Sequence, residues 1–181
     1  YDGTMTITGF ADRHIFFPPY FIEMGHTMPT RISKDKYNEL IKTFAFGVKA
    51  LGLTTGAAKA DIKYTKNGPM IGEIAARLSG GYMSGWTFPY SSDFNLTKAA
   101  IEISCGKKPL EMEKLRKELF IDAPFKMYEA SSKKVSAERA WISIPGIVKN
   151  VYGLDEKLHN ENIKNIFPRV KPGDKVVFPR N

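Results

Sequence analysis

The stretch MIGEIAARLSGG, residues 70–81, combines the apolar residues of a buried strand with two charged side chains. Glu73 and Arg77 lie four residues apart, and Ser79, Gly80 and Gly81 follow them directly. Because side chains of a strand alternate between its two faces, Glu73 and Arg77 would share one face. An acidic and a basic group on one face of an otherwise apolar strand indicate either an ion pair or a ligand site.

The segment around this stretch predicts an antiparallel hairpin, with strands at residues 58–65 and 69–76. The turn lies at residues 66–68, Lys-Asn-Gly, and two registers are compatible with it. A two-residue turn at Asn-Gly would place Asp61 opposite Ile74. This register mixes apolar and charged residues on both faces of the hairpin.

A three-residue loop, with Gly68 in the left-handed conformation, would instead place Asp61 opposite Glu73. This register separates an apolar face from a charged face, as a half-buried hairpin requires, and we therefore expect it. Its apolar face holds Ile62, Tyr64, Met70 and Ile74, and its charged face holds Asp61, Lys63, Glu73, Ala75 and Arg77.

Two carboxylates directly opposite each other on adjacent strands repel unless a cation lies between them. Mg²⁺ takes one or two protein carboxylates and completes its shell with phosphate oxygens and water, and Mn²⁺ is the alternative ion. Asp61 and Glu73 are therefore candidate metal ligands beneath a nucleotide triphosphate. Arg77 would contact a phosphate, and the small residues Ser79, Gly80 and Gly81 would let the backbone approach a ligand closely.

An exposed sheet face without any ligand explains the same residues. In that case Glu73 pairs with Lys63, and Asp61 pairs with Lys59 or Arg77. Such surface ion pairs are common and contribute little to stability. For an arbitrary hairpin this second explanation would be preferred, so the choice depends on the rest of the chain.

The composition is that of a folded protein with a substantial core. The chain has 181 residues, of which 43% are hydrophobic and 12% aromatic, and no apolar run is long enough to span a membrane. Cys105 is the single cysteine, so we expect a cytoplasmic protein without disulfides. The net charge of +8 admits nucleic-acid binding, but the basic residues form no continuous stripe. The start at Tyr1, without Met, suggests a fragment of a longer protein.

The remaining pattern predicts the α+β class: an antiparallel sheet with packed helices over residues 1–121, then a small β-rich C-terminal subdomain over residues 122–181. The strongest helical periodicity covers residues 34–51. Further helices are expected at residues 94–104, capped by Ser92 or Asp93, and at 111–118; further strands are expected at 3–10, 125–129, 137–143, 146–152 and 175–178.

Four segments resemble the C-terminal lobe of the ATP-grasp superfamily. They are Gly56 to Asp61, NGPMIGEIAARLSGG at residues 67–81, FIEMGHTMPT at 21–30 and DFNLTKAAIEISCGKKP at 93–109. The resemblance covers most of residues 1–110. It is strongest to the carboxylate–amine ligase branch, which includes enzymes similar to carbamoyl-phosphate synthase and to L-amino acid ligase.

The resemblance implies an ATP-dependent ligase that acts through an acyl-phosphate intermediate. Asp61 and Glu73 would hold Mg²⁺ and the ATP phosphates, and Arg77 would contact the terminal phosphate or the acyl phosphate. Two positions depart from the family pattern: Asp61 stands where Glu is usual, and Ala75 stands where Asn is usual. These departures leave open a degenerate, non-catalytic binding module, or a basic surface for nucleic acid, as the alternative.

The resemblance also places residues near the small-molecule carboxylate and amine substrates. Glu23 would bind a substrate amine and His26 would line the same pocket, while Ser79, Gly80 and Gly81 would form a phosphate or substrate loop. The family's adenine pocket lies in N-terminal lobes that would precede Tyr1. We therefore expect the 181 residues alone to be inactive. The identity of the substrates and the oligomeric state do not follow from the sequence.

Overall fold

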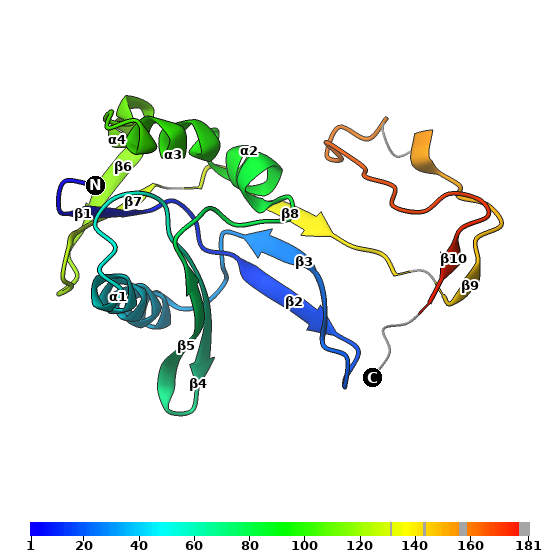
Figure 1. Ribbon diagram of the computed structural model, residues 1–181, viewed down its shortest axis with the longest axis horizontal. Helices are drawn as coiled ribbons and strands as arrows, with labels where there is room; N and C mark the ends of the chain where they lie inside the picture. The colour runs from blue at the N-terminus through cyan, green and yellow to red at the C-terminus, as the bar shows by residue number, and fades with distance from the viewer. Residues whose placement is uncertain (131, 143, 156–158, 178–181) are drawn as a thin grey trace.

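The computed structural model describes residues 1–130, 132–142, 144–155 and 159–177. It has the mixed α+β class that the sequence predicts (Figure 1). In chain order the elements are β1 (Thr4–Ile7), β2 (Asp12–Phe16), β3 (Ile22–Met28), α1 (Lys34–Ala50), β4 (Lys59–Thr65), β5 (Gly68–Ala75), the π-helix η1 (Met83–Thr87), α2 (Phe88–Ser92), α3 (Leu96–Ser104), α4 (Leu110–Leu115), β6 (Arg116–Leu119), β7 (Lys126–Ala130), β8 (Ser136–Arg139), β9 (Gly146–Ile147) and β10 (Lys175–Val176).

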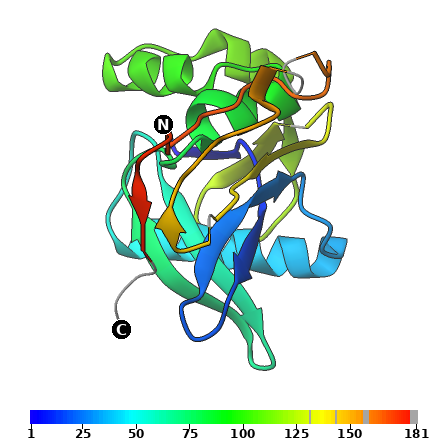
Figure 2. The same ribbon diagram turned by 90° about the vertical axis from the view of Figure 1, so that its right-hand side faces the viewer.

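The described strands form several small sheets rather than one large sheet. One three-stranded sheet has the order β1-β7-β6 and another has the order β2-β3-β8, while β4 pairs with β5 and β9 pairs with β10. Every described pair is antiparallel, as predicted, except β1 and β7, which run parallel. Figure 2 shows α1 behind the β4–β5 hairpin, with β2 and β3 beside it.

Helix α1 matches the predicted range of residues 34–51 closely. Its buried face is formed by residues at helical spacing, and Gly52 follows its C-cap with a left-handed φ of 69°. The Gly52 N–H donates to Lys49 O and the Leu53 N–H donates to Val48 O, which is the Schellman arrangement. The buried residues are Tyr37, Leu40, Ile41, Ala45 and Val48.

The β4–β5 hairpin places Asp61 opposite Glu73, but by a different route from the predicted loop. The turn is tighter, because Thr65 pairs with Gly68 and Tyr64 pairs with Pro69. The register then shifts next to Asp61, where Gly72 is an extra residue on β5. The predicted three-residue loop is therefore wrong, whereas the opposition of Asp61 and Glu73 is present.

The same bulge changes which apolar residues of β5 face the helix. Ile71 and Ile74 both approach α1 at Gly47, where a Cβ would lie 2.9 Å and 2.5 Å from their Cδ1 atoms. Met70, predicted on the apolar face, is 56% exposed and pairs with Lys63. The prediction for Met70 is wrong because regular alternation cannot anticipate an extra residue. Gly47 allows the hairpin to lie close against the helix.

Several local predictions differ from the structure, among them the strand predicted at residues 3–10, which ends at Ile7. The cap of α3 is Asn95, whose side chain accepts a hydrogen bond from the Lys98 N–H, and not Ser92 or Asp93. Residues 116–118 belong to strand β6 rather than to a helix. Strands β8 and β9 end earlier than predicted, at Arg139 and Ile147, and residues 143 and 178 of the predicted strands lie outside the described residues.

Two groups of buried side chains hold these elements together. One joins β1, α1 and β7 through Ile7, Tyr37, Ile41, Ala45 and Met127. The other joins β3 with η1 and the helices α2, α3 and α4, through Met28, Met83, Phe88, Phe94, Leu96, Ala99 and Met112.

Strands on both sides of the predicted boundary at residues 121/122 pair with one another. β7 pairs with β1 and β6, and β8 pairs with β3. The strands β9 and β10 lie to the right of the other strands in Figure 1, but the segment that joins them contacts the η1 region. Its Phe167 ring stacks on Tyr82, with ring centroids 4.2 Å apart. The two-part division stays a prediction. None of the described helices is long and apolar enough to cross a membrane.

Candidate functional site

The carboxylates of Asp61 and Glu73 share one cation, the ammonium of Lys59. Lys59 Nζ lies 3.2 Å from Asp61 Oδ2 and 2.8 Å from Glu73 Oε1. The hydrogen bond to Glu73 raises the pKa of Lys59 above its ordinary value, so the lysine is charged at neutral pH. The Asp61–Lys59 ion pair expected for a ligand-free sheet face is present, whereas the expected Glu73–Lys63 pair is not formed and Glu73 pairs with Lys59 instead.

Arg13 joins this carboxylate pair to β3. Its Nη2 donates to Asp61 Oδ1 at 2.9 Å, and its Nε lies 2.9 Å from Glu23 Oε2. The register of β2 with β3 brings Arg13 opposite His26. The sequence offered no signal for Arg13, because its partners lie ten and 48 residues away and belong to no motif with it.

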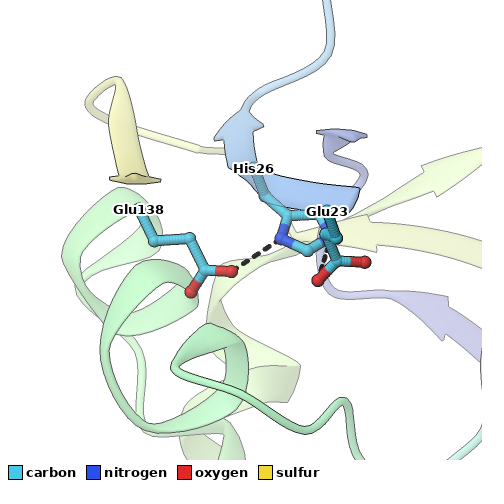
Figure 3. A group of neighbouring side chains, drawn as sticks. All are labelled: Glu23, His26 and Glu138. Atoms are coloured by element: carbon cyan, nitrogen blue, oxygen red, sulfur yellow. Dashed lines mark hydrogen bonds and ion pairs between the residues drawn. The ribbon is translucent and has the colours of Figure 1, made fainter. Parts of the chain in front are cut away.

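Glu23 and His26 lie on β3, and the His26 ring lies between the Glu23 carboxylate and the carboxylate of Glu138 on β8 (Figure 3). His26 Nδ1 lies 2.6 Å from Glu138 Oε1, and His26 Nε2 lies 3.8 Å from Glu23 Oε1. His26 is only 8% exposed, whereas Glu23 is exposed. Glu138 is also a residue that the sequence did not indicate, since it comes from the region in which no site was predicted.

Each of these three residues offers one ligand atom, and the three atoms lie within 4.8 Å of one another. However, the two ring nitrogens of His26 point to different carboxylates, and a metal ion can bind only one of them. The short contact at Nδ1 and the longer gap at Nε2 describe a hydrogen-bonded histidine with one free edge, rather than a closed three-ligand cage.

The predicted loop residues Ser79, Gly80 and Gly81 lie next to the Glu23–His26–Glu138 group. A Cβ on Gly81 would lie 4.0 Å from Glu138 Oε1, so the loop passes close to Glu138. Ser79 O accepts a hydrogen bond from the Ser84 hydroxyl, which ties the loop to η1. Arg77 lies beyond the end of β5, and its Nη1 donates to Leu78 O at 3.0 Å.

One open hollow is lined by residues from the β4–β5 hairpin and from the β3–β8 pair. Asp61 and Lys59 come from the hairpin, and Glu23, His26 and Glu138 come from β3 and β8. Arg77, Ser79, Gly80 and Gly81 line the same hollow. The structure therefore brings most of the predicted site residues to one concave surface, but the exposed Glu73 is not among the residues that line it. No described contact joins Arg77 to the Asp61–Glu73 pair.

Asp61 at this surface and Glu73 beside it carry the donor atoms that a magnesium–phosphate group requires. Asp61 and Glu73 supply hard oxygen ligands, and the Lys59 ammonium between them shows that their geometry accommodates a cation. Arg77, whose side chain is exposed, carries a guanidinium that can meet phosphate oxygens.

No family model matches the chain. Carnosine synthase 1 of Homo sapiens is 29% identical over 92 residues, which are 50% of this chain and 11% of that protein. This chain thus spans about a tenth of that relative's length.

Two solved structures have a similar fold. An L-amino acid ligase from Bacillus licheniformis superposes with a TM-score of 0.71 and 20% identity, over 90% of this chain and 37% of that one. A phosphoribosylglycinamide synthetase from Anaerococcus prevotii superposes with a TM-score of 0.69 and 16% identity, over 94% and 40% of the two chains. Both are ATP-grasp enzymes. These likenesses confirm the predicted resemblance in fold, and the chain has the fold of part of these two enzymes.

Proposed function

We propose that this chain is part of an ATP-dependent carboxylate–amine ligase that acts through an acyl phosphate. The observation that carries the proposal is the opposition of Asp61 and Glu73, with the Lys59 ammonium between them. The hairpin that holds them belongs to a chain whose fold is similar to that of an L-amino acid ligase. The names of the related proteins, a carnosine synthase and an L-amino acid ligase, support a substrate pair of this kind.

The proposed reaction has two steps. A substrate carboxylate oxygen attacks the γ-phosphorus of ATP, the bond from that phosphorus to the bridging oxygen breaks, and ADP leaves. A neutral amine then attacks the acyl carbon, phosphate leaves, and the nitrogen loses a proton to give the amide. Magnesium, when bound, would neutralise charge on the phosphates. The protein's part is positioning and electrostatic stabilisation, which explains why no nucleophilic side chain is required.

Each predicted residue has one role in this proposal. Asp61 and Glu73 bind the metal that accompanies ATP, and Arg77 contacts the transferring phosphoryl group. Glu23 binds a substrate amine, and His26 lines that subsite. The backbone at Ser79, Gly80 and Gly81 approaches the phosphates or the substrate.

Catalysis is proposed to need more of the protein than these 181 residues. The chain spans only 37% and 40% of the two solved ligases, so the adenine-binding part is expected to lie in additional lobes. The isolated chain should therefore fail to turn over ATP. Sustained ADP release by these residues alone would contradict this part of the proposal.

The proposal is tested in the full-length protein by Mg²⁺-dependent ADP release against a panel of amino acids and other carboxylates. Release that requires one carboxylate and one amine, and that is lost in Glu73→Ala, would support a ligase. Glu118→Ala on β6 is a matched control, because Glu118 pairs with Lys126 away from the hollow. ADP release that does not depend on either the carboxylate or the amine would contradict the proposal.

One observation favours a second candidate, a non-catalytic ATP-grasp domain. Lys59 already pairs with both Asp61 and Glu73, and Arg13 pairs with Asp61 as well, so each carboxylate has a cationic partner without a metal. Binding of Mg²⁺-ATP separates the two candidates, because the ligase proposal requires nucleotide binding that depends on the metal and on Glu73. Salt-sensitive oligonucleotide binding that ignores Glu73 would favour the basic-surface alternative.

A further inference from the structure

His26 has two ring nitrogens in different surroundings. Nδ1 is 2.6 Å from Glu138 Oε1, a distance typical of a strong charge-assisted hydrogen bond. An ionised carboxylate can only accept, so Nδ1 must carry the proton in this contact. In the neutral ring this leaves Nε2 with a lone pair, and Nε2 is the nitrogen that faces Glu23.

The distance between His26 Nε2 and Glu23 Oε1 would allow one hydrogen-bond donor to bridge the two atoms. Nε2 and Glu23 Oε1 are 3.8 Å apart, which is too long for a direct hydrogen bond. A single –NH₃⁺ group can donate to two acceptors at this separation with bonds of about 2.8–3.0 Å. The other oxygen of Glu23 is held by Arg13, which leaves Oε1 for a ligand.

The backbone fixes Glu138 in this place. β8 pairs with β3 so that Glu138 lies directly opposite His26. Gly25 makes the close approach of the two strands feasible, because a Cβ there would lie 2.1 Å from Glu138 O. Arg139 Nη1 donates to both Glu138 O and His26 O at 2.7 Å, which ties the two strands together again.

We propose that Glu138 is a positioning residue that holds the proton of His26 on Nδ1, so that Nε2 and Glu23 together accept hydrogen bonds from a primary ammonium group of the substrate. This inference rests on the proposed ligase function for the nature of the substrate. It assigns a role to a residue 112 positions from His26, in the part of the chain for which the sequence indicated no site.

The first readout is the proton position on His26, which does not depend on activity. The ring ¹⁵N shifts of the full-length protein labelled at histidine are recorded by NMR and assigned by loss of the His26 signals in His26→Gln. The wild-type signals should be those of a ring protonated at Nδ1. In Glu138→Ala the proton should shift to Nε2 or be shared, whereas Glu138→Gln, which keeps an acceptor, should restore the wild-type pattern. Unchanged ¹⁵N shifts in Glu138→Ala would overturn the proposal.

The second readout is discrimination between an amino substrate and its analogue with a hydroxyl in place of the amino group. Glu138→Ala should raise KM for the amino substrate about tenfold, with a smaller change in kcat. This magnitude is typical of residues that hydrogen-bond the second ring nitrogen of a binding-site histidine. KM for the hydroxyl analogue should stay within about twofold of wild type. An equal rise for both compounds would overturn the proposed role. If no substrate pair yields ADP, the ligase function fails, and the ¹⁵N shifts still decide whether Glu138 positions the ring.

Discussion

Asp61 lies directly opposite Glu73 in the hairpin, and this opposition is produced by a tight turn followed by a bulge at Gly72. Like charges placed this way destabilise a sheet unless a cation joins them. Here the cation is supplied by Lys59 from the same strand as Asp61. The relationship between the two carboxylates therefore affects the local stability of the hairpin, and the proposed function uses the same pair as metal ligands.

Replacing Lys59 with Met should tighten binding of Mn²⁺ to the protein about tenfold, equivalent to about 1.4 kcal/mol. The reason is that the ammonium already pairs with both carboxylates and repels a second cation near them. A titration of free Mn²⁺ by electron paramagnetic resonance measures this directly. Lys63→Met is the matched control, since Lys63 lies on β4 but makes no ion pair among the described residues. Equal affinities in Lys59→Met and wild type would show that the carboxylate pair is not the metal site.

Replacing Arg13 with Met should lower kcat/KM for the proposed ligase reaction of the full-length protein at least tenfold, while changing the free energy of unfolding by less than about 1 kcal/mol. Arg13 is partly exposed, so its two ion pairs contribute little to stability, but it holds Asp61 and Glu23 in fixed orientations. Steady-state kinetics and urea unfolding give the two quantities. Arg31→Met serves as the control because the Arg31 side chain makes no described contact with the site. A loss of stability as large as the loss of activity would mean that Arg13 is structural.

Replacing Gly25 with Ala should destabilise the protein by at least about 2 kcal/mol. The new Cβ would collide with Glu138 O, and the φ of 126° at this position disfavours any side chain. Urea unfolding measures the loss. Gly85→Ala, at a position with open space around it, should change stability by less than about 0.5 kcal/mol. Similar stabilities for the two variants would argue against close packing of β3 on β8.

Tyr37 should make stability depend on alkaline pH. Burial, and then the hydrogen bond to Glu129, raise the pKa of Tyr37 above its ordinary value of 10.0. The folded state therefore keeps the phenol proton where the unfolded chain has lost it, so the contribution is complete below pH about 10 and declines as the pH rises above it. Unfolding free energies measured from pH 8 to 11 should fall more steeply for wild type than for Tyr37→Phe. Tyr152→Phe, at a residue that is 83% exposed, should leave the slope as it is in wild type.

The sequence predicted the features that depend on local pattern. Periodic apolar residues and Gly52 located α1, and the alternation on either side of residues 66–68 located the hairpin. The opposition of Asp61 and Glu73 was also anticipated, although through the wrong turn, because Gly72 adds a residue that no alternation rule reveals. Short β6 could not be distinguished from a helix, since its four charged and apolar residues fit either period.

The site was only partly predictable from the sequence, because two of its residues, Arg13 and Glu138, contact partners that are far away along the chain. Glu23 and His26 belong to a recognisable segment, whereas Arg13 reaches Asp61 across 48 residues and Glu138 reaches His26 across 112. Neither partner carries a spacing or a motif that marks it. Their roles become visible only when β2, β3 and β8 are aligned in one sheet.

The most direct test of the account is the fate of the substrate oxygen. The full-length protein is given ATP, Mg²⁺, an amine and a carboxylate labelled with ¹⁸O, and the released phosphate is analysed by mass spectrometry. An acyl-phosphate route transfers one carboxylate oxygen to phosphate, so we predict one ¹⁸O atom in each phosphate and no labelled phosphate from Glu73→Gln. Amide formation with unlabelled phosphate would contradict the central claim, because the carboxylate would then have been activated in another way.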